Sequence, residues 1–145
     1  MQESELDEAG RISFRVRYAE TDQMGRAYHA WYLVWCEMGR SALLRDCGVS
    51  YAQLEKQGVF MPVRRAEVRY ERPVRYDEVV DVRTSVLRRS PSRLVFVSEI
   101  TNERGETAAR GEVELAVTDA SGKITRLPAE IMAALGAAGG EGEEP

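Results

Sequence analysis

The stretch RYAETDQMGRAYHAWYLVW, residues 17–35, decides how this sequence is interpreted. It contains the chain's one histidine, His29, seven residues after Asp22, with Gly25 between them. Before it, apolar and polar residues alternate strictly over residues 11–18, which is the period of a half-buried β-strand. After it, apolar residues recur at the spacing of an α-helix. The stretch therefore predicts a strand that gives way to a long helix at an acid and an imidazole.

A long helix is predicted from about Ala30 to Asp46, and its residues are apolar on nearly every side. Such a helix must be covered by other elements on more than one face. Two shorter helices are predicted at 50–58 and at 128–135. The remaining alternating segments predict strands at 66–71, 80–86, 94–100 and 109–117. Their connections, RRSPS and NERGE, are short enough to make antiparallel hairpins. The order predicts an α+β fold, with a curved antiparallel sheet of about five strands around one central helix.

Length and composition predict one globular domain at about 11–135, between two disordered flanks, 1–10 and 136–145, that are acidic or Gly-rich. The net charge is −4, and the flanks hold seven acids and no bases, so the domain alone carries +3. This charge suits an anionic small molecule and is too weak to indicate nucleic acid. No apolar run is long enough for a membrane span, and a cytoplasmic protein is expected.

The two cysteines, Cys36 and Cys47, are predicted to share the long helix. Eleven residues of helix separate them by roughly 16 Å, too far for a disulfide. Two free core thiols, consistent with a reducing compartment, are therefore expected.

The sequence lacks the residues that several kinds of enzyme site need. Any catalytic triad would have to use His29, and GVSYA at 48–52 lacks the second glycine of a nucleophile elbow. The chain contains no HExxH or CxxC motif, so no zinc site is expected. The glycines of GGEG lie in the C-terminal flank and do not follow a strand. The sequence therefore predicts no metal and no cofactor.

What remains is the acid and the helix start. The first backbone N–H groups of a helix have no internal partners and can stabilise an oxyanion. An unpaired Asp22 carboxylate nearby could attack a carbonyl or activate a water, so Asp22 and the His29 amide would make a minimal acyl-transfer site. Simpler roles are also open: a turn or cap residue for Asp22, a packed side chain for His29, and a core residue for Tyr18.

The segment RVRYAETDQMGRAYHAWY, residues 15–32, resembles the hot-dog-fold acyl-CoA thioesterases of the 4-hydroxybenzoyl-CoA thioesterase type, including their short-chain bacterial relatives. The shared pattern is a strand ending in Tyr, an acidic-Thr-Asp run, Gly, then Tyr-His and a small residue. The order of elements extends the resemblance over about 11–135. The resemblance implies homodimers, often paired into homotetramers, with active sites between subunits.

By position, the resemblance implies that Asp22 is the catalytic carboxylate, acting as nucleophile or general base. It implies that the backbone amide of His29 polarises the thioester carbonyl. The side chains of His29 and Tyr18 are implicated in catalysis in relatives that share Tyr-His.

The resemblance also places Arg88 and Arg89, and less strongly Arg93, where family members bind the CoA phosphates. Guanidinium groups suit phosphate, although a solvated hairpin tip would have the same composition. Arg26 departs from the family, which usually has a small or aliphatic residue there. Arg26 would disfavour apolar acyl chains or recruit a polar or acidic one if it faced the acyl pocket. It would have no such role if it faced solvent.

The expected function is therefore that of a cytoplasmic acyl-CoA thioesterase that releases a free carboxylic acid and CoA. A hot-dog enoyl-CoA hydratase is one alternative, although its Asp and His typically lie about five residues apart on a different loop. A non-catalytic protein that binds acyl-CoA or acyl carrier protein, with Asp22 as a cap, is another. The acyl group, the carrier, the route through or without an acyl-enzyme, and dimer against tetramer are left open.

Overall fold

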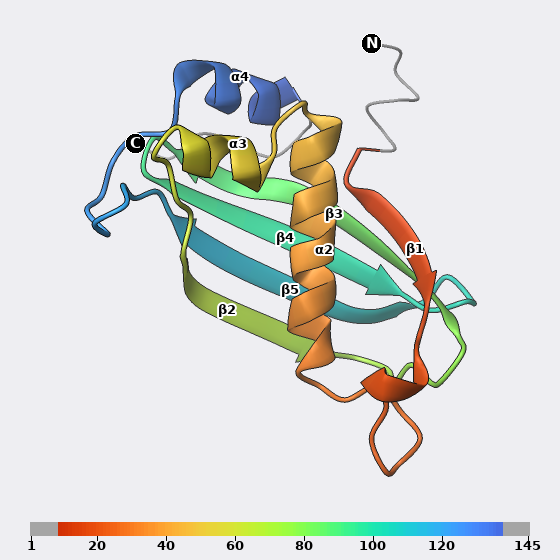
Figure 1. Cartoon of the computed structure of the whole chain (residues 1–145). Coiled ribbons are helices and arrows are strands. Elements are labelled where there is room, and N and C mark those ends of the chain that lie inside the picture. The colour runs from red at the N-terminus through yellow and green to blue at the C-terminus, as the bar shows by residue number, and fades with distance from the viewer. Residues whose placement is uncertain (1–8, 138–145) are drawn as a thin grey trace.

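The computed structural model describes residues 9–137 (Figure 1). The elements in chain order are β1 (Arg11–Arg15), η1 (Tyr18–Glu20), α2 (Trp31–Asp46), α3 (Tyr51–Lys56), β2 (Val63–Tyr70), β3 (Val79–Ser90), β4 (Arg93–Thr101), β5 (Thr107–Ala116) and α4 (Ala129–Ala137). Within the expected flanks, residues 9–10 form a turn and α4 continues to residue 137. The rest of the segments predicted to be disordered lies outside the described residues.

The five strands form one antiparallel sheet in the order β1-β3-β4-β5-β2. The predicted hairpins are confirmed: Ser90 pairs with Arg93 at the β3–β4 turn, and β4 pairs with β5 along its length. The two edge strands come from non-local pairing, since β1 pairs with β3 and β2 pairs with β5. As a result, the end of β1 and the start of β3 lie together at one end of the sheet.

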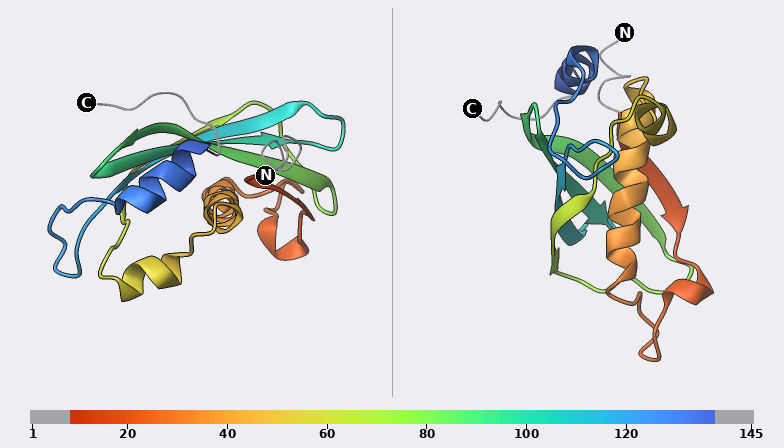
Figure 2. Two further views of the ribbon diagram at one scale, coloured as in Figure 1. Left: turned by 90° about the horizontal axis from the view of Figure 1, so that it is seen from above. Right: turned by 60° about the vertical axis from the view of Figure 1, so that its left-hand side comes forward.

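The sheet arches over α2, and all three α-helices lie on the same face of it (Figure 2). The contact is close at two glycines. A Cβ on Gly39 of α2 would collide with the Thr84 side chain, and one on Gly111 of β5 would come within 2.6 Å of Cys36 Sγ. Because no side chain stands between helix and sheet at these points, α2 is held directly against β3 and β5.

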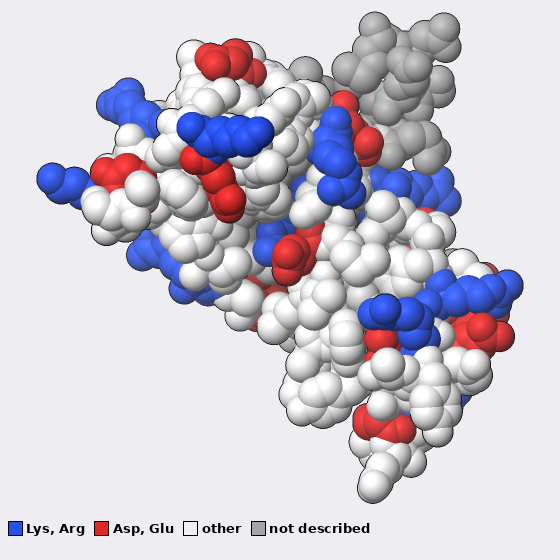
Figure 3. All heavy atoms as spheres, in the orientation of Figure 1, with Lys and Arg blue, Asp and Glu red and all other residues white. Residues whose placement is uncertain are grey.

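One side of α2 is left uncovered by the chain's own sheet. Leu33, Val34 and Met38 are exposed there, and Figure 3 shows that the surface over the lower half of α2 is largely uncharged. The edge strand β2 is also mostly exposed. The helix is therefore as apolar as its sequence predicts, but a single chain does not bury all of it.

The predicted free thiols are confirmed. Cys36 is buried and Cys47, at the end of α2, is half-buried; neither is in a disulfide. Burial raises the pKa of both thiols. Within residues 9–137, no helix is both long and apolar enough to cross a membrane.

Candidate active site

The chain leaves β1 earlier than its alternation predicts. The backbone N–H of Arg17 donates to Glu20 Oε1 at 2.7 Å, and this bond closes the short helix η1. Tyr18 therefore begins η1 instead of ending the strand. Its side chain is 78% exposed and packs edge-on against Tyr76, with ring centroids 5.6 Å apart. The predictions that Tyr18 ends the first strand and belongs to the core are wrong, because a side-chain hydrogen bond turns the backbone there.

Glu20 is a buried acid that sequence reasoning did not single out. Its side chain is 3% exposed, and Oε2 accepts a 2.8 Å hydrogen bond from Trp35 Nε1 in α2. Burial alone would raise the pKa of Glu20, but hydrogen bonds from Trp35 and Arg17 together lower it below the usual carboxyl value. The Glu20 carbonyl also accepts the N–H of Tyr28 at 2.8 Å. Glu20 thus fixes both ends of the connection between β1 and α2.

Asp22 lies between these two ends, in a tight turn over residues 22–26. Its Oδ1 accepts the backbone N–H groups of Met24 at 2.8 Å and Arg26 at 3.4 Å. Gly25 has a φ of 77°, which glycine adopts without strain. Asp22 therefore does serve the turn, as the simpler interpretation holds. Its second oxygen, Oδ2, accepts no hydrogen bond from any residue in 9–137.

The long helix begins at Trp31, within one residue of its predicted start, and Ala30 is its N-cap. The N–H groups of Trp31 and Tyr32 bond to the carbonyls of Tyr28 and His29, at 3.0 and 3.3 Å. The three-residue spacing of these bonds makes the approach to α2 tighter than an α-helix. Among the described residues, no acceptor takes the N–H of His29. This group lies at the positive end of the α2 dipole.

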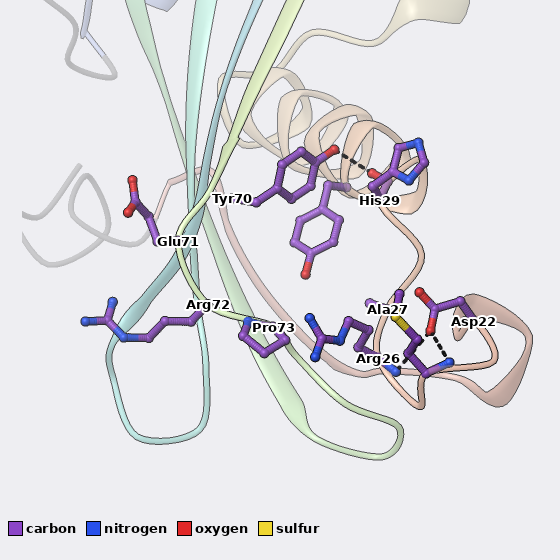
Figure 4. Close-up of a pocket in the computed structure, with 10 residues that line it drawn as sticks. Asp22, Arg26, Ala27, His29, Tyr70, Glu71, Arg72 and Pro73 are labelled. Carbon is purple, nitrogen blue, oxygen red and sulfur yellow. Dashed lines mark hydrogen bonds between the residues drawn. The ribbon is translucent and has the colours of Figure 1, made fainter.

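Asp22, Arg26 and His29 line one cavity of about 310 Å³ (Figure 4). Its other wall comes from the end of β2 and the connection that follows: Tyr70 and residues 71–73. Tyr70 donates its hydroxyl proton to the His29 carbonyl at 2.8 Å, which joins β2 to the helix start. The sequence pattern missed this wall because β2 reaches the site only through its pairing with β5.

Asp22 and His29 share the cavity without a direct contact. The His29 imidazole packs on the ring of Tyr28, with centroids 4.4 Å apart, and it points away from the Asp22 carboxylate (Figure 4). In the part of the chain that is described, no hydrogen bond joins the two side chains. Nor do three or more His, Cys, Asp or Glu side chains of residues 9–137 gather as they would to hold a metal ion.

Two sets of predicted site residues lie elsewhere. Tyr18 does not line the cavity, and its catalytic role stays a prediction. Arg88, Arg89 and Arg93 flank the β3–β4 turn. Val79, at the cavity end of β3, is nine residues from Arg88, a distance of about 30 Å at 3.3 Å per residue. A single chain therefore keeps its hairpin arginines far from its own Asp22.

Comparison with known proteins assigns the family. Residues 16–135 match the family model of the thioesterase-like superfamily. The chain is 32% identical to the acyl-CoA thioester hydrolase YbgC of Escherichia coli O6:H1, over 85% of this chain and 92% of that protein. It superposes on DHNA-CoA thioesterase from Staphylococcus aureus with a TM-score of 0.77 and 41% identity, covering 81% and 79% of the two chains. It also superposes on protein TT1821 of Thermus thermophilus with a TM-score of 0.83 and 34% identity, covering 89% and 98%. The chain therefore belongs to the thioesterase-like superfamily and is a thioester hydrolase with the hot-dog fold.

Proposed function

We propose that this protein hydrolyses acyl-CoA thioesters in the cavity beside Asp22, with Asp22 as nucleophile or general base. The observation that supports it is the position of Asp22. One of its oxygens is fixed by the turn, while the other accepts no bond from the described chain in a cavity large enough for an acyl group. A carboxylate held in this way needs no rearrangement before it reacts.

The thioester carbonyl would be polarised by the backbone N–H of His29. This donor lies at the positive end of α2 and accords with the helix-start site that relatives use. The 28–29 peptide that carries this donor is held by the Trp31 N–H on the Tyr28 carbonyl, and the next peptide by the bond from Tyr70 to the His29 carbonyl. Negative charge that develops on the carbonyl oxygen is then met by a donor that is already oriented, which is the main source of stabilisation in acyl transfer.

Two routes are consistent with this arrangement. As a general base, Asp22 takes a proton from water while the water oxygen bonds to the carbonyl carbon. As a nucleophile, Asp22 bonds to that carbon itself, and water then cleaves the anhydride. In both routes the C–S bond breaks, its electron pair leaves with the CoA thiolate, and the acyl group departs as a carboxylic acid. Mass spectrometry of enzyme quenched during turnover separates them, since only the second route adds an acyl group to Asp22.

We propose further that the working enzyme is a homo-oligomer, dimer or tetramer, whose active sites lie between subunits, as in the family. Three features support this: the exposed edge of β2, the uncovered apolar side of α2, and the distance of about 30 Å between a chain's cavity and its own hairpin arginines. In such an assembly Arg88, Arg89 and Arg93 of a second copy would bind the CoA phosphates. A cytoplasmic location, where acyl-CoA is made and used, completes the proposal.

The test is thiol release from a panel of short-chain, long-chain and aromatic acyl-CoAs, followed with a thiol-reactive dye. Turnover of at least one class supports the proposal. Binding without thiol release would instead favour an acyl-CoA or acyl-carrier-protein binding protein. Addition of water to crotonyl-CoA, without release of CoA, would favour a hydratase.

A further inference from the structure

Arg26 lines the cavity, and the proposed reaction does not require its charge. Its backbone is fixed on two sides: its carbonyl accepts the Asp22 N–H at 2.8 Å, and it bridges to Arg75 in the connection between β2 and β3. The side chain is half-buried and extends along the cavity wall toward Pro73, away from the Asp22 carboxylate (Figure 4). The question raised by the sequence, whether Arg26 faces solvent or cavity, is thereby answered.

The Arg26 guanidinium has no partner in residues 9–137. Its Nε is buried without an acceptor, and none of its nitrogens lies within ion-pair distance of a carboxylate of the described chain. The other cavity arginine, Arg72, differs. It donates to the Thr107 carbonyl at 2.8 Å and pairs with Glu106 at 3.5 Å. Since a buried donor without an acceptor is costly, an acceptor brought into the cavity would be bound by Arg26, through its Nε, in preference to Arg72.

A second donor lies beside Arg26. Tyr32 is 2% exposed, and burial raises the pKa of its phenol, so the hydroxyl stays protonated at neutral pH. The charges of Glu78 and Arg26 both act on this phenol, with opposite signs. The cavity wall opposite Asp22 therefore offers a guanidinium and a hydroxyl. Two acids line the cavity, Asp22 and Glu71, and a third, Glu78, acts on Tyr32 from outside the lining, with its Oε2 bonded to the Arg75 N–H; none of the three forms an ion pair with Arg26.

We infer that this wall is a binding subsite for a carboxylate on the acyl group, so that the preferred substrates are CoA thioesters of dicarboxylic acids. The inference rests on the proposed function and specifies its substrate class. A planar guanidinium binds a carboxylate with two parallel hydrogen bonds and neutralises its charge, and the Tyr32 hydroxyl can donate a third. An alkyl chain would leave the buried Nε of Arg26 without an acceptor. The carbonyl to be hydrolysed stays beside Asp22, and the distal carboxylate lies on Arg26.

The experiment uses non-hydrolysable thioethers, so that it does not depend on catalysis. CoA is alkylated to give S-(ω-carboxyalkyl)-CoA with three, four or five methylenes, and S-alkyl-CoA of matched length. Their affinities for the full-length protein are measured by calorimetry. At one or more lengths we expect the carboxylate analogue to bind at least about tenfold more tightly than its alkyl match. Equal or weaker binding of all three carboxylate analogues would overturn the inference.

Variants locate the effect. Arg26→Gln should abolish the preference, whereas Arg26→Lys, which keeps the charge and loses the two-pronged geometry, should retain a smaller one. Arg75→Gln is the matched control, because it removes the same charge from the residue bridged to Arg26, outside the cavity lining. A preference that survives in Arg26→Gln, or disappears in Arg75→Gln, would contradict the assignment. Thiol release is measured separately. Turnover without a preference for carboxylate substrates would contradict only this inference. Absence of turnover on every thioester would contradict the proposed function.

Discussion

Two turns in the molecule have the same backbone hydrogen-bond pattern but different surroundings: DQMGR at 22–26 and DASGK at 119–123. In each, Oδ1 of the first residue accepts the N–H groups of the third and fifth residues. These distances are 2.8 and 3.4 Å in the first turn, and 2.9 and 3.0 Å in the second. In each, the fourth residue is a glycine with positive φ, 77° for Gly25 and 87° for Gly122.

The surroundings of the two turns separate folding from function. Both turns are largely exposed, but the 119–123 turn follows β5, whereas the 22–26 turn lines the cavity beside α2. A third turn of this kind, NERGE at 102–106, begins with Asn102, whose side-chain oxygen accepts the same two N–H groups at 3.0 Å each. The turn therefore needs an acceptor and not a charge. The negative charge of Asp22 is not required for folding and is left available for chemistry.

The sharpest test of this comparison is Asp22→Asn. The amide oxygen keeps the turn, as Asn102 does, but it is neither a base nor a nucleophile. We expect kcat to fall by about 10²- to 10⁴-fold, with a melting temperature close to that of the wild type. Thiol release and thermal unfolding measure the two effects. Asp119→Asn, the same change in the matched turn, should leave kcat unaltered. Near-normal turnover in Asp22→Asn would rule out the mechanism.

The next largest effect is expected at Glu20, which anchors only the first turn. Glu20→Gln removes the charge from three hydrogen bonds and should lower the free energy of unfolding by about 1–3 kcal/mol. Because the β1–α2 connection loosens, kcat should fall as well. Glu106→Gln is the control, since that acid bonds to Asn102 and Arg104 in the third turn and is 41% exposed. Equal losses of stability in urea titrations of both variants would show that burial of Glu20 adds nothing.

A smaller effect should be shared by both turns. Gly25→Ala and Gly122→Ala each place a Cβ at positive φ with no atom within 4 Å of it, so backbone strain is the whole cost. Each should lower the free energy of unfolding by about 1–2 kcal/mol. Only Gly25→Ala should also reduce kcat, because only that turn carries Asp22. Loss of activity in both variants would mean that global stability limits turnover, and the comparison between the turns would fail.

The smallest expected effect is a pH dependence. Hydrogen bonds hold the pKa of Glu20 below its usual value of 4.5 in the folded protein. Its ionised form therefore stabilises the fold fully above that value, and the contribution is lost as pH falls through the lowered pKa. Wild type should exceed Glu20→Gln in free energy of unfolding by a constant amount between pH 7 and 5.5, and by less at pH 3.5. If the difference in free energy of unfolding between the two proteins stayed the same at pH 3.5, Glu20 would not ionise more readily in the folded protein than in the unfolded chain.

Prediction from sequence succeeded where the pattern is local. Alternation located all five strands, and the short connections correctly predicted two hairpins. The end of β1 was wrong because Glu20, a polar residue outside the apolar periodicity, accepts the Arg17 N–H and bonds to Trp35 fifteen residues away, which bends the chain. Asp22 and His29 could be proposed from sequence because the helix start is itself local; they line one cavity, and their catalytic roles stay predictions.

The second wall of the cavity was not predictable in the same way. Tyr70 reaches His29 from 41 residues further along the chain, and only the pairing of β2 with β5 brings it there. The direction of Arg26 was equally inaccessible, since it depends on the bridge to Arg75. A backbone bridge between two loops leaves no periodic pattern in the sequence from which it could be predicted.

The unbonded N–H of His29 has an evolutionary consequence. A main-chain donor is encoded by every codon except those of proline, so drift at position 29 preserves it whatever side chain results. The imidazole is exposed to selection separately. Saturation mutagenesis at this position should therefore show two levels of activity loss. Every substitution that removes the imidazole should cause the smaller loss, and proline alone should cause a larger one.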